Sequence, residues 1–208
     1  MATIFFRKLL IHINSLVARD SHDQPVEATP EPHMNTNSPR GTSAADASGE
    51  RHWANASAPE LVEYILARYH AVHRELLPEL IRLARKVEQV HADSADCPHG
   101  LADHLSGMAQ GLESHMRKEE DVLFPMLASG QGALAGAPIT VMRMEHDEHE
   151  AALRRLAGMT DDLRPPPVAC ATWRALYAGL QTFRRDLLAH IQTENEILFQ
   201  RFAPAAVN

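Results

Sequence analysis

The sequence predicts an all-α fold: an antiparallel, up-down-up-down four-helix bundle that follows a mostly disordered N-terminal extension. Four long segments carry apolar residues in alternating steps of three and four, the pattern of helices packed at a small crossing angle. The connections between them are short and contain Pro, Gly or both, which favours antiparallel neighbours. No stretch alternates with period two over the length of a strand. The predicted helices span residues 59–91, 99–128, 138–160 and 168–202.

The first 58 residues differ in composition from the rest of the chain. Residues 1–19 hold an apolar run interrupted by basic residues. The run is too short and too charged to span a bilayer, and because it is interrupted and no clear cleavage site of small residues follows, we do not expect a signal peptide. We expect a short amphipathic helix that docks on the bundle or on a partner, with loose membrane contact as the alternative. Residues 20–57 are rich in Pro, Ser, Thr and Asn, which predicts a disordered linker. We therefore expect an extension over 1–58 and one bundle domain over 59–203.

The charge balance and the cysteines restrict the class of protein. The chain of 208 residues has 27 acidic and 20 basic side chains and a formal net charge of −7. This balance argues against nucleic acid or an anionic membrane as a partner. The two cysteines, Cys97 and Cys170, fall in predicted connections. We expect reduced, unpaired thiols in a cytoplasmic protein that is not integral to a membrane.

A His-x-x-x-Glu-x-x-x-Leu-Phe motif occurs twice, first at His115 and Glu119 and again at His190 and Glu194. Side chains four residues apart share one face of a helix, so each copy aims an imidazole and a carboxylate at one point. Both copies continue the apolar stripe of their helix, where an unpaired carboxylate is costly. A bound cation would compensate, and this mixture of ligands suits iron or zinc better than magnesium or calcium.

The other two helices each carry a His-x-x-His pair. The pairs are His70 with His73 and His146 with His149. Because their members are three residues apart, both histidines of a pair can approach the core of the bundle. Periodicity alone therefore leaves open which member of each pair reaches the centre.

The spacing of these motifs indicates an internal repeat. His115 follows His70 by 45 residues, and His190 follows His146 by 44. The chain therefore resembles two helical hairpins joined in sequence. One His from each of the first and third helices, with the two His-x-x-x-Glu copies, gives four imidazoles and two carboxylates. That set suits two metal ions, each with two terminal histidines, bridged by the two glutamates. Positions would remain for an oxo or hydroxo bridge and a small ligand.

Height along the bundle separates three further histidines from this set. His91 lies 21 residues from His70, which is about 30 Å along a helix. His104 precedes His115 by 11 residues, and His99 lies in or beside a connection. We expect structural or solvent-exposed roles for His91, His99 and His104.

Taken together, these motifs resemble the hemerythrin-like domain of the RIC (repair of iron centres) family, in a short form without the N-terminal domain that bears adjacent cysteines. The similarity covers residues from about 60 to 202. It is carried by the segments 68–80, 114–125, 145–148, 172–175 and 190–195.

The resemblance implies a non-haem di-iron centre in which the two glutamates bridge the ions. The histidine of the first pair that follows Tyr69 would be the ligand, which selects His70. The implied metal ligands are His70, His115, Glu119, His146, His190 and Glu194. The resemblance places three more groups beside the centre rather than on it: His73, Glu145 and His149. Histidine outnumbers glutamate in this set, unlike in the carboxylate-rich ferritin-type bundles.

The resemblance also implies a function in the response to nitrosative or oxidative stress. Two iron ions would serve to repair, or to supply iron to, damaged iron–sulfur proteins, with NO or O₂ as small ligands. Such a protein is an iron donor or NO binder rather than a classical enzyme, although NO reduction stays open. The alternative is a carrier or sensor of NO or O₂. A third hypothesis is an interaction bundle whose histidines form a polar network without metal. Zinc could also occupy a site rich in imidazole.

Overall fold

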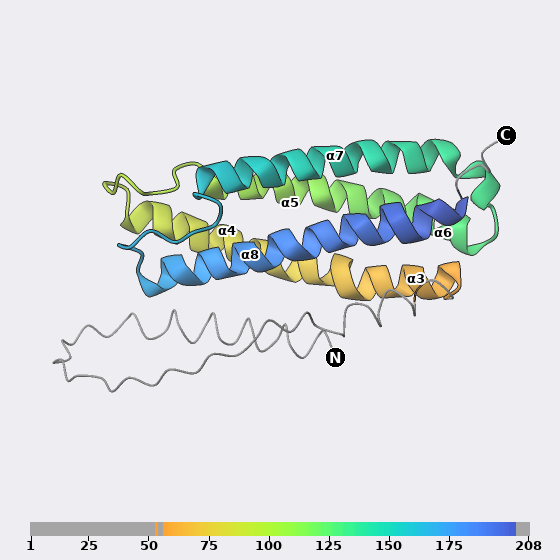
Figure 1. The fold of residues 1–208 in the computed structure, drawn as a ribbon, viewed down its shortest axis with the longest axis horizontal. Coiled ribbons are helices and arrows are strands. Elements are labelled where there is room, and N and C mark those ends of the chain that lie inside the picture. The colour runs from red at the N-terminus through yellow and green to blue at the C-terminus, as the bar shows by residue number, and fades with distance from the viewer. Residues whose placement is uncertain (1–52, 54–55, 203–208) are drawn as a thin grey trace, which may run out of the picture.

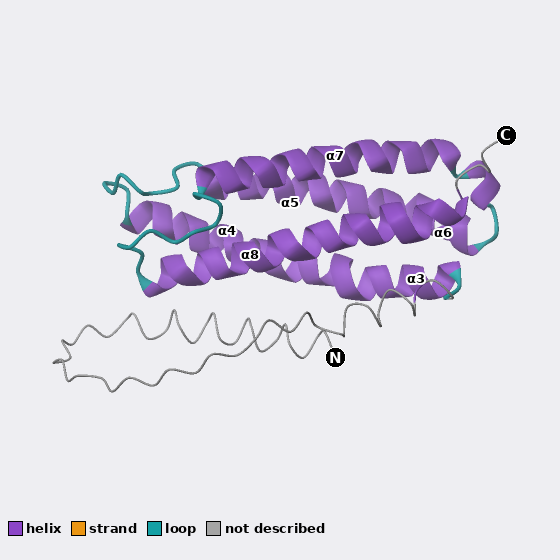
Figure 2. Ribbon diagram, viewed as in Figure 1, coloured by secondary structure: helices purple, strands orange, loops and turns teal. Residues whose placement is uncertain are grey.

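The computed structural model describes residue 53 and residues 56–202, and within them every regular element is a helix (Figures 1 and 2). The prediction of an all-α bundle is confirmed. The predicted amphipathic segment and nearly all of the predicted linker lie outside the described residues. Over the described part of the chain, no helix is long and apolar enough to cross a membrane.

Each of the first two long rods is built from an α-helix, one wider π-helical turn and a second α-helix. The first rod consists of α3 (Ala58–Ile65), η1 (Leu66–His70) and α4 (Ala71–Val90). The second consists of α5 (Leu101–Lys118), η2 (Glu119–Leu123) and α6 (Phe124–Ala128).

The third rod is one uninterrupted α-helix, and the fourth ends in a π-helical and a 3₁₀ turn. A short 3₁₀ turn, η3 (Gly132–Leu134), precedes the third rod, which is α7 (Gly136–Met159). The fourth consists of α8 (Ala171–Gln192), η4 (Thr193–Leu198) and η5 (Phe199–Phe202). The four rods agree with the four predicted helices to within a few residues.

Consecutive rods are neighbours in space, and the last one returns beside the first. Thus α4 packs against α5 and α8, and α5 packs against α7. Figure 1 shows the four rods side by side with their connections at the two ends of the bundle. This is the predicted up-down-up-down arrangement.

The bundle begins with a capped helix. The Ser57 N–H donates to Glu60 Oε2 at 2.7 Å, and the Glu60 N–H donates to Ser57 Oγ at 3.4 Å. This reciprocal capping box satisfies two amide groups that the first helical turn leaves without partners. Pro59 sits in the same turn, where its missing N–H costs nothing.

The apolar core is divided into two clusters. One lies toward the 91–100 and 160–170 connections and includes Trp173 and Phe183. The other lies toward the opposite end and includes Leu61 and Phe199. In every rod the predicted metal-ligating residues lie where the residues of one cluster give way to those of the other. The bundle therefore has a buried polar layer between two apolar ones.

Three of the four rods widen into a π-helical turn at this polar layer. The turns are η1, which ends at His70; η2, which begins at Glu119; and η4, which contains Glu194. A π-helical turn inserts one extra residue into an α-helix and shifts the direction of the side chains that follow. Apolar periodicity predicts uninterrupted α-helices at these positions, so the three turns are a difference between the prediction and the structure.

Candidate metal centre

The structure brings the six predicted ligands together in two overlapping groups of four. The first group is His70, Glu119, His190 and Glu194, and the second is His115, Glu119, His146 and Glu194. In each group the candidate ligand atoms lie within 4.8 Å of one another. All six side chains are buried, with at most 1% of any residue exposed. Both glutamates belong to both groups. We call the first group position 1 and the second group position 2.

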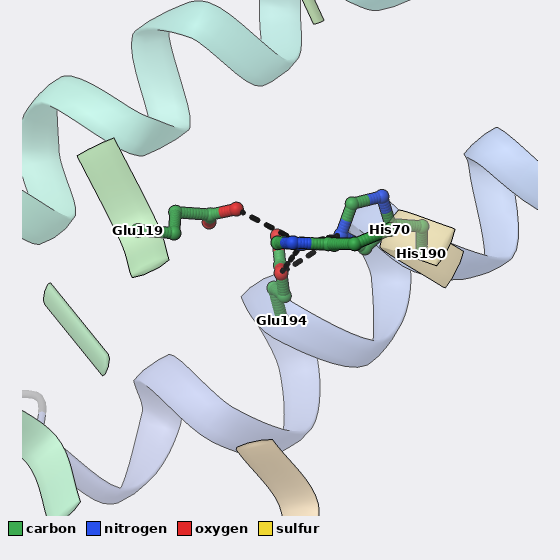
Figure 3. A group of neighbouring side chains, drawn as sticks. All are labelled: His70, Glu119, His190 and Glu194. Atoms are coloured by element: carbon green, nitrogen blue, oxygen red, sulfur yellow. Dashed lines mark hydrogen bonds and ion pairs between the residues drawn. The ribbon is translucent and has the colours of Figure 1, made fainter. Parts of the chain in front are cut away.

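In position 1, two imidazoles from the first and fourth rods face the two carboxylates (Figure 3). His190 Nε2 lies 2.9 Å from Glu194 Oε1, and His70 Nε2 lies 3.4 Å from Glu119 Oε2. The two imidazole Nε2 atoms are 3.2 Å apart. All four groups therefore converge on one small volume.

Position 2 repeats this arrangement with the second and third rods. His146 Nε2 lies 3.0 Å from Glu194 Oε2, and His115 Nε2 lies 3.5 Å from Glu119 Oε2. The two Nε2 atoms are again 3.2 Å apart. Glu194 thus turns one oxygen toward each position, as a bridging carboxylate does, and Glu119 Oε2 lies between the two.

The electrostatics of the polar layer favour a cation. Burial and the adjacent Glu194 carboxylate raise the pKa of Glu119 well above its ordinary value. Burial is also the main cause that lowers the pKa of His70 to about 4 and of His115 to about 3. These two imidazoles are therefore neutral near pH 7, the form that binds metal.

Unpartnered oxygen atoms in the layer also fit a metal ion. Neither carboxylate oxygen of Glu119 has a hydrogen-bond partner among the described residues, although both are buried. Leaving such a group unpaired costs at least about 1–3 kcal/mol. A divalent ion of ordinary ligand distance, about 2.0–2.2 Å, would satisfy these oxygens and the facing Nε2 atoms together.

Two of the four imidazoles are held by carboxylates on their other nitrogen. His70 Nδ1 donates to Glu120 Oε1 at 2.7 Å, and Arg74 holds Glu120 in place at 2.8 Å. His115 Nδ1 donates to Glu145 Oε2 at 3.0 Å, and Lys118 pairs with the same carboxylate. Such partners select the tautomer with a free Nε2 and increase the basicity of the ligand.

The charged neighbours keep these two supporting carboxylates ionised. Burial opposes ionisation, but Arg74 and His70 together hold the pKa of Glu120 below its ordinary value. Lys118 and His115 do the same for the pKa of Glu145 against the effect of burial.

The remaining two imidazoles have weaker support. His146 Nδ1 donates to the amide oxygen of Asn195 at 3.1 Å. His190 Nδ1 is buried and has no hydrogen-bond partner among the described residues. Instead, the ring of Tyr69 stacks on His190 at 5.1 Å between centroids and 16° between planes. The Tyr69 hydroxyl is fixed by a 3.2 Å hydrogen bond with Thr193.

The second members of the His-x-x-His pairs lie beside the two groups rather than in them. The ring of His73 is 5.4 Å from that of His190, and the ring of His149 is 5.0 Å from that of His115. Both nitrogens of His73, and Nε2 of His149, are buried without a partner in the described part of the chain. The structure therefore places His70 and His146 in the two groups of four, and His73 and His149 beside them, a choice that periodicity left open.

Three further histidines, His91, His99 and His104, lie away from the polar layer, as their sequence distance from the motifs predicts. His91 Nε2 is 3.3 Å from Cys170 Sγ, and His104 Nε2 is 3.0 Å from the Ala152 carbonyl oxygen. His99 is exposed. Cys97 and Cys170 are free thiols, as expected.

Three neighbours of the centre received no role in the sequence analysis: Glu120, Asn195 and Tyr69. Each is adjacent in sequence to a predicted ligand, and Glu120 and Asn195 both follow the glutamate of their motif. Their side chains reach an imidazole of another rod, and helical periodicity within one rod cannot reveal such a contact. A comparison of the two motif copies could have found Glu120 and Asn195, because each directly follows the glutamate of its motif and accepts a hydrogen bond from Nδ1 of a histidine.

The fold and this polar layer agree with the comparison to known families. The model of the hemerythrin HHE cation binding domain matches residues 61–202, which is more than half of the chain. The chain belongs to this family. The match covers all four rods and all six predicted ligands.

The resemblance to the family of proteins that repair iron centres is also confirmed. Named relatives include the iron-sulfur cluster repair protein YtfE of Pectobacterium atrosepticum, 49% identical over 158 residues that make up 76% of this chain and 72% of that protein. The protein of the same name from Cronobacter sakazakii is 51% identical over 152 residues, 73% of this chain and 69% of that protein. The one from Edwardsiella ictaluri is 41% identical over 190 residues, 91% of this chain and 78% of that protein.

Proposed function

We propose that the chain holds two iron ions, one in each position, with Glu119 and Glu194 bridging them. The overlap of the two groups supports this proposal, because two carboxylates shared by four imidazoles are the donors that a paired centre needs. The six proposed ligands are His70, His115, Glu119, His146, His190 and Glu194.

The donor set supports a transition metal over magnesium or calcium. Neutral imidazole and carboxylate bind iron, zinc and copper well, whereas magnesium and calcium prefer oxygen donors alone. Each position offers four donors, two imidazoles and the two shared carboxylates, so the number of donors fits both zinc and an iron ion with further positions open. We favour iron because the relatives are named for iron-sulfur cluster repair, and we expect zinc as a competitor during purification.

We propose that this centre acts on iron–sulfur clusters damaged by nitrosative or oxidative stress, as a repair protein or a source of iron. The observation that supports it is a fully buried two-position site in a chain about half identical to proteins named for iron-sulfur cluster repair. Damaged iron–sulfur proteins would be its partners, and NO or O₂ its small ligands. The free thiols at Cys97 and Cys170 fit a reducing compartment, and we expect action in the cytoplasm.

The residues of the chain have distinct parts in this mechanism. The imidazole Nε2 atoms and the two glutamates would bind the ions, and Glu120 and Glu145 hold two imidazoles in the tautomer that leaves Nε2 free. The apolar clusters above and below keep bulk water from the layer. When bound, ferrous ions with open positions supply the capacity to bind NO and to be released to an acceptor.

Repair can be tested with an iron–sulfur enzyme inactivated by NO. Protein loaded anaerobically with ferrous ions should restore the enzyme's activity, and the Glu119→Gln variant should not. The His91→Ala variant is the matched control, because His91 lies far from the polar layer, and it should restore activity as the parent does. Iron-loaded protein that never restores activity would refute repair while leaving the metal centre intact.

Reversible binding of NO or O₂ is the second candidate function. The aromatic rings of Phe124 and Phe199 pack against His70 and His146 at 5.7 Å and 6.0 Å between centroids. An apolar surround of this kind suits an uncharged diatomic ligand. A carrier of O₂ would show a stable oxygenated absorption spectrum in air. Rapid oxidation of the iron under air would exclude that role.

A further inference from the structure

The two metal positions are related by the internal repeat of the chain. If the first hairpin is matched with the second, His70 corresponds to His146 and His115 corresponds to His190. Position 1 takes one imidazole from each hairpin, and so does position 2. The repeat therefore exchanges the two positions, so their surroundings can be compared residue by residue.

The residues that support the imidazoles break this symmetry. Glu120, which binds Nδ1 of His70, corresponds to Asn195, which binds Nδ1 of His146. Glu145, which binds Nδ1 of His115, corresponds to Tyr69, which only stacks on the ring of His190. In position 2 both imidazoles thus donate to an acceptor, and in position 1 only one does.

No other described side chain compensates at His190. The ring of the unpartnered His73 lies 5.4 Å from that of His190 between centroids, and no hydrogen bond joins the two. Stacking by Tyr69 fixes the plane of the His190 ring, but an aromatic face does not accept the Nδ1 proton as a carboxylate does. The His190 imidazole is therefore the least supported of the four ligands.

We propose that the two positions bind metal with unequal strength, and that position 1 gives up its ion first. The loss of one outer hydrogen-bonding partner typically weakens metal binding by about 10–100-fold. Tyr69 occupies the place that Glu145 has in the other hairpin and gives His190 no acceptor for its Nδ1 proton. Position 1 is therefore the one from which the ion should exchange more readily. The ion in position 2 stays and keeps the two bridging glutamates neutralised. The inference rests on the proposed two-iron centre and names which ion is available for transfer.

Release of iron to a chelator tests the proposal. Protein loaded anaerobically with two ferrous ions per chain is mixed with excess chelator, and the coloured complex is followed with time. We expect two phases of one ion each, with rates that differ by roughly 10-fold or more. Glu120→Gln should speed the fast phase, because it weakens His70 in position 1. Glu145→Gln should speed the slow phase and leave the fast one unchanged.

A third variant tests the asymmetry directly. Asn195→Leu removes the acceptor of His146 and keeps the branching of the side chain, so position 2 should come to resemble position 1. Its slow phase should move toward the fast one. Glu79→Gln is the control, because Glu79 pairs with the exposed Arg82 at 2.6 Å and, among the described residues, makes no ion pair with a predicted ligand. It should release iron as the parent does.

The outcomes separate this inference from the proposed function. Uptake of fewer than two ions per chain would defeat the two-iron centre itself. Uptake of two ions followed by a single release phase, or a fast phase accelerated by Glu145→Gln rather than by Glu120→Gln, would overturn the asymmetry alone. Circular dichroism of each variant before loading shows whether it has folded.

Discussion

At the scale of single residues, the buried carboxylate of Glu119 is the group that most needs explanation. It is fully buried and neither oxygen has a hydrogen-bond partner among the described residues. Burial and the adjacent Glu194 carboxylate raise its pKa, which favours the protonated form when no cation is bound. Binding of a metal must therefore displace a proton from this residue, which couples the affinity of the site to pH.

Substitution of Glu119 should separate metal binding from folding. Glutamine has the shape of the protonated carboxyl group, so we expect Glu119→Gln to fold with nearly parental stability when metal-free. It should bind well under two ions per chain, because the bridge to both positions is lost. Iron and zinc analysis of untagged protein measures this. His91→Ala should keep the parental count, and a loss of metal in that variant would contradict the separation of His91 from the site.

The stability of the metal-free bundle should depend on pH in a defined window. Four buried histidines have lowered pKa values: His70 and His149 at about 4, His115 at about 3, and His73 well below its ordinary value. The unfolded chain protonates them near pH 6.5, so it binds more protons than the folded chain between about 6.5 and 4. Stability is therefore full above about pH 6.5 and is lost as the pH falls toward 4.

Glu119 acts in the opposite direction, because its raised pKa favours the folded chain as the pH falls. Four histidines outweigh one glutamate, so the net free energy of unfolding should decrease toward pH 4. Denaturant unfolding of chelated protein at pH 7.5, 6, 5 and 4.5 measures this. A free energy that stays level or increases across the series would show that the histidines are not buried as neutral groups.

Much of the site could be predicted at this scale, and the limits have a physical cause. Polar residues in an apolar stripe pointed to His115, Glu119, His190 and Glu194, since burial demands a compensating partner. The choice of His70 over His73 did not follow from periodicity, because residues three apart share a face of the helix. Glu120 was also missed, since its contact crosses between rods.

At the scale of elements, the three π-helical turns coincide with the polar layer. Each adds one residue to its rod, which redirects the side chains beyond it while the rod continues. The third rod, α7, has no such turn and places His146 by ordinary helical geometry. A regular α-helical period has no place for an extra residue, which explains why the predicted helix ranges were correct while these turns were missed.

Deletion of one residue from η2 tests its importance. Removing Val122, which is 51% exposed, should restore an α-helical turn and leave Phe124 and Leu127 in their apolar cluster, because the deletion takes out the one extra residue. The midpoint of denaturant unfolding should therefore change little, and Val122→Ala, which removes the same side chain at constant length, is the matched control. A loss of roughly 3–5 kcal/mol, the cost of unburying such side chains, would show that the turn is needed to keep them in register.

At the scale of the whole molecule, the four rods followed directly from apolar periodicity and short connections. The polar layer lies between two separate apolar clusters, so it is held in place from both ends of the bundle. The cost of keeping charged and unpartnered groups there is met when metal is bound. Folding and metallation should therefore be thermodynamically linked.

Removal of metal should lower the thermal stability of the bundle. A ligand at about 1,000 times its dissociation constant stabilises a fold by about 4 kcal/mol, which corresponds to roughly 10 °C in a domain of this size. Differential scanning calorimetry of iron-loaded and chelated protein should show a shift of at least this size. In Glu119→Gln the two curves should coincide, and a shift that persists there would place the metal elsewhere.

The exchange of the two positions by the internal repeat has a further consequence. Each position takes half of its imidazoles from either hairpin, and each bridging glutamate comes from a different one. A single hairpin therefore cannot assemble either position. If the connection over residues 129–135 were cut, the two halves would have to find each other before any ion could be held. Bound metal would then strengthen the association of the two pieces, which also share the two apolar clusters, and withdrawing it would weaken that association.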